Sequence, residues 1–257
     1  MFLAVRTRPD ILLDIVVLAG RFENPTIKDV AVLRRILVYV YQTRESGLIY
    51  KEGDWAFWAS IDASFNTYAN GKGHSGFLLF LDKLSACILA KSLMQKVVSN
   101  SSTQAELICL NEAVLHILYI ADILKELLPG IKVFPIKIHN DNQSMITLVK
   151  QPVVNRQGRS KFMNRALFKV NENVEAGEIV MIYENTEDLV ADFLTKAVHG
   201  ERFKIFRARV LGMSNNKEIV KLLGKSKEEV DRNVRRLLLG EKENHINILY
   251  LEAESSS

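Results

Sequence analysis

The sequence predicts an α/β protein with a mixed sheet flanked by helices. Three short apolar runs separated by turn residues lie between residues 55 and 92 and predict three antiparallel strands. A long helical pattern begins near Thr103, and two more strand runs, 133–139 and 178–183, alternate with helical patterns up to residue 211. Hairpin strands followed by alternating strands and helices favour a five-stranded mixed sheet covered by helices.

The composition is that of an ordinary globular protein. Of 257 residues, 48% are hydrophobic and 25% are charged, enough for one large domain or two small ones. The net charge of +4 permits nucleic acid as a partner without demonstrating it. Charged residues interrupt every long apolar run, so no membrane partner is expected. Cys87 and Cys109 fit neither a zinc nor a disulfide spacing and are expected to be reduced core residues of an intracellular protein.

Residues 1–46 are expected to be helical. Pro9 stands where a first-turn proline belongs, and apolar residues follow it at helical spacing. Pro25 and Thr26 open a second helix, which Gly47 ends.

The hairpin strands are predicted at 55–62, 76–81 and 85–90. The turn cluster 66–73 separates the first two. The helix from Thr103 has apolar residues at helical spacing and ends at Pro129-Gly130. Further helices are predicted at 142–150, 162–176, 186–196 and 200–211, with a basic connection at 151–161. In the nearly neutral segment 214–257, a capping box at Ser226 and a strand at 246–251 are predicted.

Four carboxylates stand at the ends of predicted elements, and each has an ordinary structural alternative. Asp62 ends the first strand or is a turn residue. Glu106 fits a capping box with Thr103, in which the glutamate reaches back to the helix start. Asp141 follows the fourth strand and fits a helix cap, and Asp192 fits the solvated flank of an apolar helix.

Taken together, these acids predict a metal site. If the first and fourth strands are parallel neighbours, their carboxyl ends lie at one edge of the sheet, beside helix starts. Carboxylates gathered there repel one another and lose hydration, and divalent cations remove that cost. Mg²⁺ prefers oxygen ligands, and two ions about 4 Å apart suit in-line attack on a phosphodiester.

The chain resembles the C-terminal end of the Pol polyprotein of copia-type retrotransposons, from Phe2 to Met213. The resemblance covers the end of the reverse transcriptase and the RNase H domain. The matching stretches are LAVRTRPD at 3–10, NPT at 24–26, RIL at 35–37, GLIY at 47–50, SGF at 75–77, SSTQAE at 101–106, NDNQS at 140–144, VADFLTK at 190–196 and LGM at 211–213.

The resemblance implies a fold, a site and an activity. It implies a helical reverse-transcriptase remnant at 1–54, similar to a thumb or connection segment, an RNase H-like domain at 55–213 and a tail of unknown role. The implied catalytic and metal-binding acids are Asp62, Glu106, Asp141 and Asp192, with two Mg²⁺ or Mn²⁺ ions. The implied reaction cleaves the RNA strand of RNA–DNA hybrids, and the rest of the reverse transcriptase is an expected partner in a full-length element.

Four basic residues lie near a position where the family carries a basic helix start: Arg156, Arg159, Lys161 and Arg165. They are expected phosphate contacts, and a solvated basic face is the alternative.

Departures from the family pattern favour a second hypothesis. Phe162 follows Lys161 where the family has a histidine, and Ser64 and Phe65 stand where it has an aspartate and a tryptophan. The sequence has no Tyr-x-Asp-Asp polymerase motif. The alternative function is therefore a decayed or truncated copy that is catalytically inactive, or a co-opted remnant that binds nucleic acid.

Overall fold

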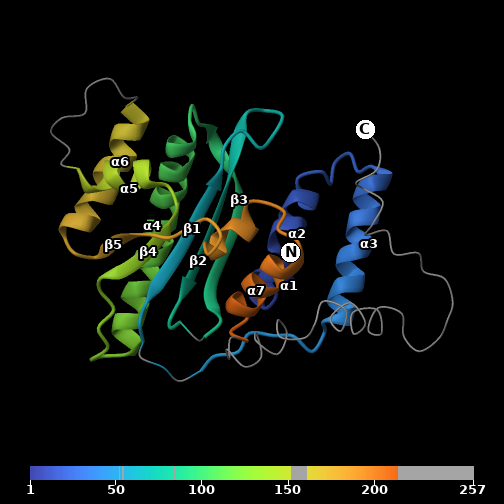
Figure 1. Ribbon diagram of the computed structural model, residues 1–257, viewed down its shortest axis with the longest axis horizontal. Helices are drawn as coiled ribbons and strands as arrows, with labels where there is room; N and C mark the ends of the chain where they lie inside the picture. The colour runs from blue at the N-terminus through green and yellow to red at the C-terminus, as the bar shows by residue number, and fades with distance from the viewer. Residues whose placement is uncertain (52, 54, 84, 152–160, 214–257) are drawn as a thin grey trace.

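The protein is represented by a computed structural model that describes residues 1–51, 53, 55–83, 85–151 and 161–213, with the backbone alone for 161–163. Within these residues, five strands form one sheet in the order β3-β2-β1-β4-β5 (Figure 1). The strands are β1 Trp58–Ser64, β2 Lys72–Phe80, β3 Cys87–Val98, β4 Ile136–Asn140 and β5 Ile179–Tyr183. β1, β2 and β3 pair antiparallel, whereas β4 lies parallel to both β1 and β5. The predicted mixed five-stranded sheet flanked by helices is confirmed. The elements predicted within 214–257 lie outside the described residues.

One face of the sheet is covered by α4 (Ser102–Leu127), α5 (Gln143–Lys150) and α6 (Lys161–Glu175) (Figure 1). Alternate residues of the strands point into this layer, as Phe77 and Leu79 of β2 do. α4 is, by length and composition alone, apolar enough to cross a membrane. That is weak evidence, because α4 is also the main core helix against this sheet and its inward side is buried.

The opposite face is covered by helices from both ends of the described chain. α1 (Phe2–Arg6), η1 (Pro9–Ile11) and α2 (Leu12–Ala19) pack there with the 3-10 helix η3 (Val190–Leu194) and with α7 (Gly200–Val210) (Figure 1). Leu12 shares a core cluster with Leu78 of β2 and Phe206 of α7. The N-terminal helices thus pack on the same sheet, and the predicted domain boundaries near residues 54 and 213 stay predictions.

A buried ion pair fixes the N-terminal segment. The Arg8 guanidinium donates to both carboxylate oxygens of Asp10, at 2.9 and 2.8 Å, and to the carbonyl of Thr43 at 3.0 Å. The Tyr39 hydroxyl donates to Asp10 at 2.6 Å. Burial and the Asp10 charge raise the pKa of Tyr39 to about 12, so this hydroxyl stays protonated and remains a donor. Tyr39 lies on α3 (Ile27–Gln42), so the network ties that helix to η1, which Asp10 belongs to and Arg8 precedes.

Two predicted elements differ most from the structure, although β1, β2 and β4 also begin three or four residues away from their predicted starts. The strand predicted at 85–90 runs from Cys87 to Val98, where it pairs with β2 as far as Lys72. Its second half is mostly exposed, as is common for an edge strand, so it lacks the apolar run that predicts a strand. The helix expected over Thr186–Lys196 is a turn followed by the short η3. Leu189, Val190, Phe193 and Leu194 are all buried, so the segment is enclosed on several sides rather than on one helical face.

Candidate active site

The candidate site lies where β1 and β4 separate. Their parallel pairing ends at Ser60 and His139. Beyond that point, the side-chain amide of Asn140 donates to the carbonyl of Ile61 at 3.0 Å and takes the place of a strand partner. The fork brings the end of β1 and the residue after β4 to the same space.

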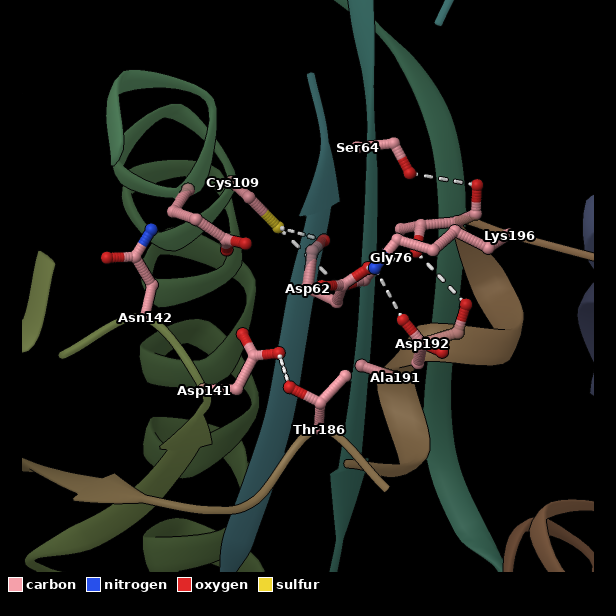
Figure 2. Close-up of polar contacts among 12 residues, drawn as sticks. Asp62, Ser64, Gly76, Cys109, Asp141, Asn142, Thr186, Ala191, Asp192 and Lys196 are labelled. Carbon is pink, nitrogen blue, oxygen red and sulfur yellow. Dashed lines mark hydrogen bonds and ion pairs between the residues drawn. The ribbon is translucent and has the colours of Figure 1, made fainter. Parts of the chain in front are cut away.

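Three of the four predicted acids meet at this fork. Asp62, Glu106 and Asp141 each offer an oxygen, and these atoms lie within 4.8 Å of one another. Asp62 is 1% exposed and Glu106 is 4% exposed, whereas Asp141 is half-buried. All three line an open cleft of about 890 Å³ (Figure 2 shows Asp62 and Asp141). Residues about 80 positions apart in the chain therefore form one carboxylate cluster.

The capping-box prediction for Glu106 is wrong. The N-cap of α4 is Ser101, whose hydroxyl accepts from the Gln104 N–H at 3.2 Å. Thr103 is therefore already inside the helix, and Glu106 lies in the second turn. Its carboxylate accepts from the Asn140 amide at 3.0 Å instead of reaching back to the helix start.

The structural alternatives for the other three acids are also wrong. Asp62 lies inside β1 rather than in a turn. The N-cap of α5 is Asn142, which accepts from the Met145 N–H at 2.9 Å, and Asp141 instead accepts from the Thr186 hydroxyl at 2.6 Å (Figure 2). Asp192 is 2% exposed and is not on a solvated flank.

Burial makes the cluster electrostatically unfavourable without a cation. Burial raises the pKa of Asp62 to about 6; the Lys196 ammonium and the Thr195 hydroxyl oppose this effect. Burial, and next the Asp62 charge, raise the pKa of Glu106 well above its ordinary value, although Asn140 donates to it. A cation bound between these two carboxylates would favour their ionised forms and so offset the cost of burying them.

Asp192 lies beside the cluster but is held by two basic side chains. Its Oδ1 accepts from the Lys196 ammonium at 2.6 Å, and its Oδ2 lies 3.0 Å from the Arg202 guanidinium. The Lys196 nitrogen is also 3.6 Å from Asp62 (Figure 2). In the described part of the chain, the group of acids close enough to share one ion does not include Asp192.

The position of η3 is set by its close packing against β2 at Gly76. A side chain at Gly76 would put its Cβ 2.7 Å from Leu194 and 2.8 Å from Thr195, so glycine is required for η3 to lie directly on the strand. The backbone N–H of Ala191 donates to the Ser60 hydroxyl at 3.1 Å. The SGF motif therefore serves to bring the Asp192 segment to the sheet.

A buried histidine supports the end of η3. The Ser92 hydroxyl donates to the Leu194 carbonyl at 2.8 Å and lies 2.7 Å from Nε2 of His74, and the Tyr68 hydroxyl lies 2.6 Å from Nδ1. Because the Ser92 proton is used on Leu194, Nε2 must donate to Ser92. Burial lowers the pKa of His74, so the ring is neutral and its Nδ1 accepts from the Tyr68 hydroxyl.

We expect this histidine to weaken the fold in acid. Burial lowers the pKa of His74 to about 4. As the pH falls from about 6.5 towards 4, the unfolded chain takes up a proton at this histidine that the folded chain does not. The contribution of the neutral ring to the free energy of unfolding is therefore complete above pH 6.5 and is lost as the pH falls, by on the order of 2 kcal/mol at pH 5. Urea unfolding at pH 7 and pH 5 should show this extra loss in the wild type but not in His74→Gln. An identical pH dependence in both chains would disprove the assignment.

Sequence reasoning missed Asn140, which orients Glu106. Its side chain is completely buried and makes three hydrogen bonds, to Glu106, to Ile61 and from the Asn142 N–H. The sequence feature that could have identified Asn140 is its place on the inward face of β4, directly before Asp141 in the NDNQS motif.

We expect Asn140→Ala to weaken Mn²⁺ affinity by about 10–100-fold, because residues that orient ligands typically contribute that much. Titration calorimetry would measure it. Asn173→Ala is the matched control, since the Asn173 amide donates within α6, to the Lys169 carbonyl, and Asn173 does not line the cleft. Equal affinity in both variants would show that Asn140 does not position the site.

The predicted nucleic-acid contacts are only partly described. Arg156 and Arg159 lie outside the described residues, and the side chain of Lys161 is not described. Arg165 is exposed on α6, which neither supports nor removes its expected role.

The chain is similar to Pol polyproteins of retrotransposons, as its motifs predict. It is 27% identical over 217 residues to the retrovirus-related Pol polyprotein from transposon TNT 1-94 of Nicotiana tabacum, covering 84% of this chain and 16% of that protein. It is 28% identical over 216 residues to that of transposon RE1 of Arabidopsis thaliana, covering 79% and 14%. With the transposon Ty1-LR3 Gag-Pol polyprotein of Saccharomyces cerevisiae it shares 23% identity over 211 residues, covering 79% and 12%. The chain thus spans less than a fifth of the length of these relatives. No family model matches it.

Solved RNase H structures are similar to the fold at low identity. LC11-RNase H1, isolated from compost, is 12% identical with a TM-score of 0.39, over 55% of this chain and 92% of that one. The PFV RNase H domain is 11% identical with a TM-score of 0.40, over 60% and 97%.

Proposed function

We propose that this chain, which has an RNase H-like fold and a sequence similar to copia-type retrotransposon Pol polyproteins, hydrolyses the RNA strand of RNA–DNA hybrids. The observation that carries the proposal is the convergence of Asp62, Glu106 and Asp141 at the fork between β1 and β4. Lys196, which lines the cleft, pairs with both Asp62 and Asp192 and so links Asp192 to the other acids.

The donor set suits a hard divalent cation. It offers carboxylate oxygens, the ligands that Mg²⁺ and Mn²⁺ prefer, and its two buried acids have raised pKa values. Asp62, Glu106 and Asp141 would hold the metal, and Asn140 would orient Glu106 toward it. A bound divalent ion would stabilise charge on the phosphodiester and lower the pKa of water. Occupancy by two ions, as the resemblance implies, is part of the proposal.

An RNA–DNA hybrid is the proposed partner. The proposal is supported by the open form of the cleft, which is lined mostly by polar residues and would admit a duplex backbone toward the carboxylates. Selection for RNA would use the 2′-hydroxyl and the shape of the minor groove, and Arg156, Arg159, Lys161 and Arg165 are proposed phosphate contacts. The rest of a reverse transcriptase is a proposed partner in a longer polyprotein, and an intracellular location belongs to the same proposal.

One observation favours the alternative of an inactive or co-opted remnant. Both oxygens of Asp192 are already bound by Lys196 and Arg202, so this acid is not free to hold an ion in the arrangement described. Under this alternative the fold binds nucleic acid without cutting it.

Cleavage of a labelled hybrid with Mg²⁺ tests the proposal. The wild type is expected to cut the RNA strand and to spare duplex DNA. Asp141→Asn should lose at least about 10³-fold in rate, because metal coordination contributes several kcal/mol. The matched control is Asp122→Asn, since Asp122 is an exposed acid on α4. No cutting by the wild type, or equal cutting by wild type and Asp141→Asn, would reject the nuclease and leave the remnant.

A further inference from the structure

Lys196 occupies a position between two acids of the candidate site. Its ammonium lies 2.6 Å from Oδ1 of Asp192 and 3.6 Å from Oδ2 of Asp62. The two carboxylates are only 3% and 2% exposed, whereas the lysine side chain is 48% exposed (Figure 2). The lysine side chain is therefore half-exposed, while its ammonium contacts two buried carboxylates.

Asp62 belongs to two cation positions at once. One is formed with Glu106 and Asp141, whose oxygens lie within 4.8 Å of one another. The other is formed with Asp192, and the lysine ammonium already occupies it. Two neighbouring positions that share one carboxylate suit a pair of cations. In this chain the Lys196 ammonium is one of the two.

The charges of the site balance with one divalent ion. When all four acids are ionised they carry four negative charges, and Lys196 and Arg202 offset two of them. One divalent ion therefore neutralises this set of charges. A second ion would leave two excess positive charges, which withdrawal of Lys196 reduces to one.

We infer that Lys196 holds the second cation position, so that the chain binds one divalent ion at Asp62, Glu106 and Asp141 and admits a second only by displacing the ammonium. This inference deepens the proposed function and rests on its metal site.

Lys196 and Arg202 differ in how easily they can leave. An ammonium on a flexible, half-exposed stem can turn to water, because its donors are not set in a rigid plane. Arg202 is braced by the Thr186 carbonyl, by Glu187 at 3.6 Å and by the Phe206 ring at 5.0 Å. Lys196 is therefore the displaceable cation and Arg202 the fixed one.

The test is Mn²⁺ titration calorimetry on the full chain without nucleic acid. Lys196→Met should bind a second Mn²⁺ at least about tenfold more tightly than the wild type, equivalent to about 1.4 kcal/mol. Without metal, Lys196→Met should unfold at a lower temperature, and Mn²⁺ should restore more of its stability than it does for the wild type. Lys196→Arg keeps the charge and should bind a second Mn²⁺ no more tightly than the wild type. Lys204→Met is the control, since Lys204 pairs with Glu201 on α7.

The outcomes separate this inference from the nuclease proposal. Equal affinity for a second ion in wild type and Lys196→Met, or no Mn²⁺ binding by either chain, overturns the inference. Hybrid cleavage is measured separately on the same preparations. Cleavage by the wild type without any change in second-ion affinity rejects only the role of Lys196. A raised affinity in Lys196→Met without cleavage by the wild type supports that role and rejects the nuclease.

Discussion

Glu106→Gln is expected to stabilise the metal-free protein and at the same time to abolish its response to divalent ions. The carboxylate is 4% exposed and lies beside Asp62, so an isosteric neutral amide removes a desolvated charge and its repulsion. Burial disfavours the charged form of an acid that has no cationic partner, so a neutral amide in the same place should raise the stability of the metal-free protein. Loss of one of three carboxylate ligands should reduce hybrid cleavage by roughly 10³-fold or more. Urea unfolding with and without Mn²⁺ measures the first two effects.

The opposite signs make this variant informative. A residue that only supports the fold would lose stability and activity together. Glu126→Gln is the matched control on the same helix, because Glu126 is exposed and far along α4 from the cleft. A fall in metal-free stability, or undiminished stabilisation by Mn²⁺ in Glu106→Gln, would contradict the placement of Glu106 in a metal site.

Asp10→Ala is expected to destabilise the whole chain by about 3–5 kcal/mol, because it leaves a buried guanidinium without its partner. The side chains of Arg8 and Asp10 are 4% and 0% exposed. The substitution also removes the acceptor of the Tyr39 hydroxyl, which ties α3 to the network. The Arg8→Met/Asp10→Leu double variant should recover most of the loss, because apolar side chains replace the ion pair without leaving a charge.

The control for this ion pair is Glu45→Ala, which removes the exposed pair with Arg44 and should cost less than about 1 kcal/mol. Urea unfolding followed by far-UV circular dichroism measures all three chains. A single cooperative transition that shifts in Asp10→Ala would show that residues 1–46 fold with the sheet. A loss below about 1 kcal/mol would contradict the described packing of this segment.

The architecture was predictable because the strands and helices carry clear periodicity. The run of apolar residues in β2 is continuous because Phe77 and Leu79 face one core cluster while Leu78 and Phe80 face the other. Periodicity failed where burial is irregular. The segment after Thr186 contains enough apolar residues for a helix, but contacts from several directions make it a turn and a 3-10 helix.

The acids of the site were predictable as residues but not as partners. Sequence alone could not decide between Ser101 and Thr103 as the cap of α4, because both are good caps and the choice depends on how the chain leaves β3. It also could not show that Asn140 orients Glu106 or that Lys196 reaches Asp62, since these contacts join residues from different elements.

The most direct test of the metal site is an anomalous difference map from a crystal soaked in Mn²⁺. We expect a peak about 2.1 Å from carboxylate oxygens of Asp62, Glu106 and Asp141, at the fork of β1 and β4. A well-ordered map without that peak, or one in which any of the three carboxylates points away from the other two, would contradict the account.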